Sequence, residues 1–174
     1  SGAIGTNNYV KGENTYVLGA GNNNSGTASD GVAAVNSGIF GNSNNLEGDS
    51  NRIVGNSNKV EKASMAQSGS TTPKKLEDIM VTGNDNVVSG DPDTATARDA
   101  GDVTGITVTG SKNKVVAKNN KGKNLTDIQI VGNNNEIDTS DKDRDLSNTQ
   151  ILGSNVKATL GNSTYIGSGS AYVV

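Results

Sequence analysis

The chain has 174 residues, including 25 Asn and 23 Gly but only 35 residues of Leu, Ile, Val and Phe, and its formal net charge is −3. This length fits one domain, and the charge is too small to keep a chain unfolded, so the few apolar residues must be placed very regularly. Because Cys and His are both absent, disulfides, a Cys/His zinc site, a thiol nucleophile and an imidazole acid or base are excluded.

The composition also bears on partners. No apolar run approaches the roughly 18 residues of a membrane span, and no signal peptide is visible. The sequence pI of about 4.9 and the interspersed Lys and acidic residues argue against a nucleic-acid partner. We therefore expect no membrane contact, no nucleic acid and no cofactor. The opening Ser1-Gly2 and the abrupt end at Val174 suggest a fragment, which we treat as one domain over 1–174.

A short phrase with a central glycine recurs along the chain. In order, the phrases are AIGTNN, VLGAGN, IFGNSN, IVGNSN, VTGNDN, VTGSKN, IVGNNN, ILGSNV and YIGSGS. Their glycines are Gly5, Gly19, Gly41, Gly55, Gly83, Gly110, Gly132, Gly153 and Gly167. The sequence separations between successive glycines are 14, 22, 14, 28, 27, 22, 21 and 14. The base period is therefore about 14 residues, and the remainder is insertion.

Aligned on the glycine, which we number position 0, the phrases share a strict pattern. Position −2 is never polar and holds Ala3, Val17, Ile39, Ile53, Val81, Val108, Ile130, Ile151 and Tyr165. Position −1 is apolar in seven of the nine phrases, and position +5 is apolar in eight. Position +3 is Asn in seven, namely Asn8, Asn22, Asn44, Asn58, Asn86, Asn113 and Asn135.

This pattern predicts an all-β fold, a parallel β-roll (solenoid) with about 14 residues per coil. A unit of about 14 residues is too short for a helical repeat but fits two short strands and two turns. The recurring glycine, from Gly19 to Gly167, supplies a turn with positive φ or a close backbone approach, and stacked Asn side chains form ladders between coils.

The two adjacent apolar positions before the glycine predict an assembly. Neighbouring residues on a strand point to opposite faces, so one face lines the roll and the other needs a cover. Another copy of the same chain supplies that cover over the full length. The residues assigned to core or trimer packing are Val17, Ile39, Ile53, Val81, Val108, Ile130, Ile151 and Tyr165. The pattern leaves open which face is inside.

The insertions are predicted to leave the roll at one corner, just after the second strand. They span 25–33, 61–75, 89–102, 116–124 and 138–145. They are polar, and such loops commonly carry binding function, although any single one could be solvated decoration. The candidate receptor-binding residues are Met65, Lys74, Lys75, Asp91, Asp93, Arg98, Lys118, Lys121, Lys123, Asp141, Asp143 and Arg144.

The last insertion has one feature of a calcium loop, because Asp141, Asp143 and Asp145 alternate. An EF-hand would next need Gly and, at its twelfth position, Glu, where this chain has Leu146 and Leu152. We therefore predict a solvated charged turn and no metal site.

The phrases SGIFGNSN, NRIVGNSN and STYIGSGS resemble the head repeats of trimeric autotransporter adhesins, the YadA-like heads of pathogenic Gram-negative bacteria. In that family a 14-residue unit of the type Asn-Ser-Val-Ala-Ile-Gly-x-x-Ser closes one coil of a left-handed parallel β-roll, and three chains pack in parallel. The resemblance covers nearly the whole chain through its nine glycines. Here, however, the family's Ser at position +3 is mostly Asn, and its Ala at position −2 is a bulkier residue.

The resemblance implies a non-enzymatic adhesin head on the bacterial surface, assembled as a parallel homotrimer. The Asn- and Lys-rich composition is similar to that of fusobacterial adhesins, some of which bind CEACAM receptors, so a host cell-surface glycoprotein or a matrix protein is the implied partner. A trimeric phage-fibre segment is the alternative from another class. A polysaccharide-processing β-helix enzyme is disfavoured, because acidic residues in the variable loops have no fixed partner.

Overall fold

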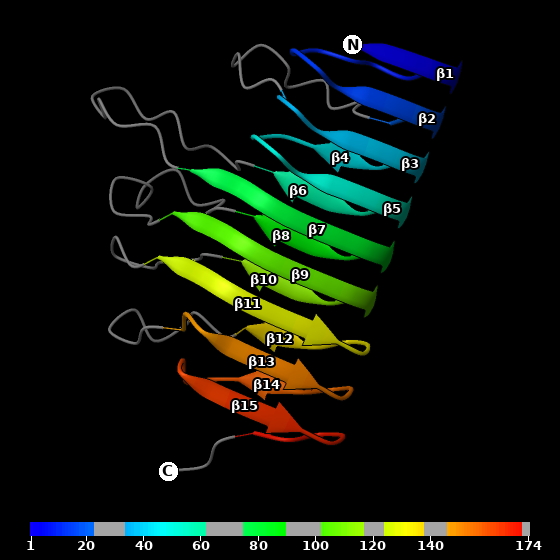
Figure 1. Cartoon of the computed structure of the whole chain (residues 1–174). Helices are drawn as coiled ribbons and strands as arrows, with labels where there is room; N and C mark the ends of the chain where they lie inside the picture. The colour runs from blue at the N-terminus through cyan, green and yellow to red at the C-terminus, as the bar shows by residue number, and fades with distance from the viewer. Residues whose placement is uncertain (23–33, 62–74, 90–101, 117–123, 138–145, 172–174) are drawn as a thin grey trace, which may run out of the picture.

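The computed structural model describes residues 1–22, 34–61, 75–89, 102–116, 124–137 and 146–171, which form two parallel β-sheets and no helix (Figure 1). The nine-stranded sheet contains β1 (Gly2–Thr6), β2 (Tyr16–Ala20), β3 (Gly38–Asn42), β5 (Arg52–Asn56), β7 (Leu76–Asn84), β9 (Val103–Ser111), β11 (Leu125–Val131), β13 (Thr149–Leu152) and β15 (Ser163–Ile166). The six-stranded sheet contains β4 (Asn45–Leu46), β6 (Lys59–Glu61), β8 (Val87–Ser89), β10 (Lys114–Val116), β12 (Glu136–Ile137) and β14 (Lys157–Ala158).

The chain alternates between the two sheets from β3 to β15 while it advances from one end of the molecule to the other. Strands of each sheet are neighbours in the order in which the chain makes them, and β1 and β15 lie at opposite ends of the stack (Figure 1). We call one strand of the nine-stranded sheet, with the turn and short strand after it, a rung, and name each rung by its position 0 glycine. The expected all-β, parallel architecture is confirmed, and the arrangement is compatible with a β-solenoid.

The register of the nine-stranded sheet follows the glycine alignment. Gly5 pairs with Gly19, and the pairing continues through Gly41, Gly55, Gly83 and Gly110. The side chains at position −2 belong to residues that pair with one another in the same way, as Ile39 does with Ile53. Insertions of different length therefore leave the phase of the repeat unchanged.

The core lies between the two sheets and is built from columns of like residues. Position −2 points inward, as do position +5 and the apolar residues at position −7. The largest fully buried side chains include Ile53, Leu76, Ile130, Ile137 and Ile151. Position −1 points outward. The structure thus answers the question that the sequence left open, since the column from Val17 to Tyr165 is core and its following neighbours are surface.

A further inward column, at position −4, was missed in the sequence. It holds Ile79, Ile106 and Ile128 in three consecutive central rungs, all of them buried. In other rungs this position carries a small polar residue, which is Thr15, Ser37, Asn51, Thr149 or Ser163. The central strands β7, β9 and β11 are also the longest, with nine, nine and seven residues. The core between the two sheets is therefore most apolar in the middle of the stack.

The Asn residues at position +3 form a continuous buried ladder along one corner. Asn58 shows the pattern: its Nδ2 donates to the Gly83 carbonyl at 2.7 Å and to the Asn44 Oδ1 at 3.1 Å. Its Oδ1 accepts from the backbone N–H and the Nδ2 of Asn86 at 3.0 and 2.9 Å. Each amide in the interior of the ladder is thereby satisfied without water. The ladder ends where Val156 replaces Asn and only its N–H donates to Asn135.

The glycine beside this ladder is required by close approach. Gly55 has φ of 134°, and a Cβ added there would lie 1.8 Å from the Gly83 carbonyl oxygen. Two residues later Ser57 is in the left-handed region at φ of 56°, a conformation that short polar residues tolerate best. The turn therefore requires Gly at position 0 and favours Gly, Asn, Asp or Ser at position +2.

Candidate functional site

The outer surface of the nine-stranded sheet is apolar along most of its length. Alternation places positions −3 and −1 on this surface. The large hydrophobic side chains exposed here, which we call the apolar face, are Ile4, Tyr16, Leu18, Phe40, Val54, Met80, Val131, Leu152 and Ile166, with exposed fractions between 41% and 70%. In these two columns Arg52 is the only charged residue. Thr107 and Thr109 interrupt this surface in the rung of Gly110, but exposed apolar residues in such number mark an interaction site.

The parallel arrangement of the strands also indicates that the outer face of the nine-stranded sheet is covered by a partner. Parallel sheets occur almost only with both faces covered, and here the inner face meets the six-stranded sheet while the outer face meets nothing within the described chain. Phe40 and Val54, at 58% and 41% exposure, lie side by side in paired strands. The apolar face is therefore suited to binding another apolar surface over many rungs.

The outer surface of the six-stranded sheet is charged instead. Position +4 points outward on this surface and holds Lys59, Lys114, Glu136 and Lys157. Glu61 lies in the neighbouring outward column and accepts a hydrogen bond from Asn45 Nδ2 at 2.6 Å. We call this surface the charged face.

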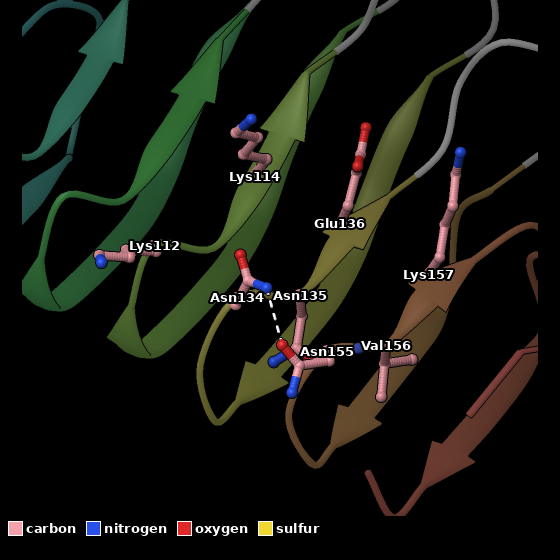
Figure 2. Close-up of a pocket in the computed structure, with 8 residues that line it drawn as sticks. All are labelled: Lys112, Lys114, Asn134, Asn135, Glu136, Asn155, Val156 and Lys157. Carbon is pink, nitrogen blue, oxygen red and sulfur yellow. Dashed lines mark hydrogen bonds between the residues drawn. The ribbon is translucent and has the colours of Figure 1, made fainter. Parts of the chain in front are cut away.

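A shallow depression lies on the charged face at its C-terminal end (Figure 2). The neighbouring strands β10, β12 and β14 contribute Lys114, Glu136 and Lys157 to it, and these three residues pair in register. Asn134 Nδ2 donates to Asn155 Oδ1 at 2.7 Å along the rim. The remaining lining residues are Lys112, Asn135 and Val156. The depression thus combines cationic and carboxylate groups on paired strands with amide groups of the adjoining turns.

The described ends of the insertions are tied together at a third location. The Lys75 N–H donates to Asp102 Oδ1 at 3.0 Å, and the Asp102 N–H donates to Asn124 Oδ1 at 2.9 Å. Ser147 Oγ then donates to the Asn124 carbonyl at 2.7 Å. Successive re-entry points therefore form a ladder of their own, which fixes where each insertion rejoins the nine-stranded sheet.

Lys75 is the one candidate receptor-binding residue that the structure describes. It is exposed, and its Nζ lies 3.8 Å from Glu77 Oε2. Eleven others lie outside the described residues: Met65, Lys74, Asp91, Asp93, Arg98, Lys118, Lys121, Lys123, Asp141, Asp143 and Arg144.

No group of three or more Asp or Glu side chains in the described ranges could hold a metal ion. Within the same part of the chain no helix is long and apolar enough to cross a membrane.

Comparisons with protein-family models, with curated proteins and with solved structures found no match to this chain. The described residues offer three surfaces as candidate functional sites: the apolar face, the charged face and the corner where the insertions rejoin.

The charged face was missed in the sequence, although a signal for it exists. Position +4 lies between the buried Asn of position +3 and the buried apolar residue of position +5. A Lys recurs there in the rungs of Gly55, Gly110 and Gly153. A charge between two buried columns must point outward on a strand, so reading this column would have predicted a basic row.

Proposed function

We propose that this chain is the head of a trimeric bacterial surface adhesin and has no enzymatic activity. In this proposal the two sheets form a left-handed parallel β-roll with about 14 residues per coil, and three parallel copies place their apolar faces toward one another. The observation that carries the proposal is the apolar face, which runs along nearly every rung and contains a single charged residue, Arg52.

The regularity of the apolar face supports a copy of the same chain as its cover. The pattern repeats rung by rung, so a parallel partner meets the same sequence of side chains at each height. Closed rotational symmetry then covers every copy's apolar face and leaves none exposed. The charged face, on the opposite side of the roll, remains in contact with solvent in such an assembly.

The proposed activity is attachment to a host cell-surface glycoprotein, such as a CEACAM receptor, or to a matrix protein. The insertions supply recognition of the receptor, because the turns at the other corner of the roll are short and built mainly of Asn, Ser and Gly. Three copies of each insertion on one rigid head would bind several receptors at once, and avidity would raise weak single contacts to firm attachment.

Replacement of the insertions tests this function. Each insertion is exchanged for the one-residue link found at Lys11, Glu47 or Thr159, and binding to a panel of host glycoproteins and matrix proteins is measured on the folded assembly. We expect at least one replacement to abolish binding while the melting temperature and the oligomeric state stay those of the parent. Undiminished binding after all five replacements would place the receptor site on the strands and refute the assignment.

A further inference from the structure

A straight row of cationic side chains runs across the charged face. Lys59 pairs with Val87, and Val87 with Lys114. On the other side Lys114 pairs with Glu136, and Glu136 with Lys157. A lysine therefore occurs at every second strand, with neighbouring lysines about 9.5 Å apart at the strand spacing of parallel sheets. All three lysines are exposed.

Glu136 interrupts this row and restricts the ligand that fits it. A plain polyanion that lies along Lys59, Lys114 and Lys157 would place negative charge beside the Glu136 carboxylate, which is unfavourable. A carboxylate accepts hydrogen bonds only, so the ligand must present a donor between two of its anionic groups. Sugar hydroxyls supply such donors, and the Asn134 and Asn155 amides beside them can bind further hydroxyls.

We infer that the charged face binds a linear acidic polysaccharide of the sulfated class, which lies along the stacking direction of the six-stranded sheet. Its sulfates contact Lys59, Lys114 and Lys157, and the hydroxyls of the sugar between two sulfates donate to Glu136 in the depression shown in Figure 2. The site is separate from the insertions, and it lies on the opposite side of the roll from the apolar face.

The surroundings of the row argue against single-stranded nucleic acid as the ligand. Non-specific nucleic-acid grooves combine positive charge with aromatic side chains that stack on bases. From Lys59 to Lys157 the outward positions of the described strands carry no aromatic residue. The net charge of −3 also disfavours a purely electrostatic partner, so the ligand must match the local pattern of charges and acceptors.

The test measures the affinity of the folded protein for heparin by calorimetry in about 50 mM NaCl, where screening is weak. Dextran, polyphosphate and single-stranded DNA are measured in parallel. Lys114→Gln should weaken heparin binding about fivefold, whereas Lys75→Gln, which removes the same charge at the insertion corner, should change it less than about twofold. Glu136→Ala should also weaken binding, although it removes a negative charge from the face.

Several results would overturn this inference. Heparin could fail to bind, or Lys114→Gln and Lys75→Gln could weaken it equally, which would indicate net charge alone. Tighter binding by Glu136→Ala, with polyphosphate or DNA bound as well as heparin, would indicate a non-specific polyanion surface. Loss of heparin binding in the variant without insertions would move the site to the loops. That variant otherwise keeps heparin binding even if the proposed receptor function fails.

Discussion

The two outer surfaces of this molecule have the same backbone arrangement but opposite chemistry. Both belong to parallel strands stacked in register, and both have their inner sides packed on the same core. Outward, one presents Leu18, Phe40 and Val54, and the other presents Lys59 and Lys114. Since both sheets pack on the core in the same way, folding does not require their outward residues to differ. We therefore attribute the difference to the surroundings of each face.

The largest effect is expected from breaking the core that both faces share. Ile53 is 1% exposed, and Ile53→Asp would bury an unpaired carboxylate between the sheets. We expect the free energy of unfolding to fall by more than about 4 kcal/mol, measured by chemical denaturation. The control is Lys59→Asp on the charged face, whose side chain is exposed. If both variants unfolded alike, the inward direction of position −2 would be wrong.

The buried asparagine ladder should show the next largest effect. Asn58→Ala removes both donors and the acceptor that join three rungs, and leaves the Gly83 carbonyl and the Asn44 Oδ1 each without one partner. We expect a loss of about 2 to 4 kcal/mol in thermal or denaturant unfolding.

The matched control for the ladder is Asn56→Ala, two residues earlier in the same turn. Asn56 Oδ1 accepts from the Asn42 N–H and Nδ2, and its own N–H and Nδ2 donate to Asn84 Oδ1, but all three side chains are exposed. Water can replace these bonds, so the loss should stay below about 1 kcal/mol. Equal losses in the two variants would show that burial does not distinguish the two ladders.

The smallest effect is expected on the charged face. Lys59→Ala removes an exposed side chain that no core residue depends on, so the melting temperature should change by less than the equivalent of about 0.5 kcal/mol. Its mass in solution should equal that of the parent, apart from the lost side-chain atoms. A change of oligomeric state in this variant would mean that the charged face, rather than the apolar face, joins the copies.

Much of the fold could be predicted from the sequence, because each rung repeats the same physical constraints. The Gly, Asn and apolar columns indicated the strand register, since a misplaced rung would break the Asn58 ladder or bury a charge. The direction of Ile53 against Val54 was not predicted, because both are apolar. The alternation of inward and outward positions along the strand could have predicted this direction. The apolar Ile79, at position −4, shares a face with position −2, while the polar Asn56, at position +1, shares a face with position −1.

A half-length repeat within the larger repeat unit also escaped the sequence reading. Gly48-Asp49-Ser50-Asn51 repeats as Gly55-Asn56-Ser57-Asn58, seven positions later. Both segments place Gly and Ser at positive φ, and Asn51 Nδ2 donates to the Leu76 carbonyl at 2.9 Å just as Asn58 does to Gly83. The turn that precedes β5 therefore repeats the conformation of the turn that follows it. The course of the insertions could not be predicted, because they obey no such periodic constraint.

The central claim, that copies of this chain cover the apolar face, is tested most directly by mass in solution. Light scattering at micromolar concentration should give three times the 17.7 kDa chain mass for the parent. The variant Phe40→Lys with Leu152→Lys, at two exposed positions on the apolar face, should give a smaller mass with its β-sheet circular dichroism retained. A parent that is a stable monomer, or a lysine variant with an unchanged trimer mass, would contradict the account.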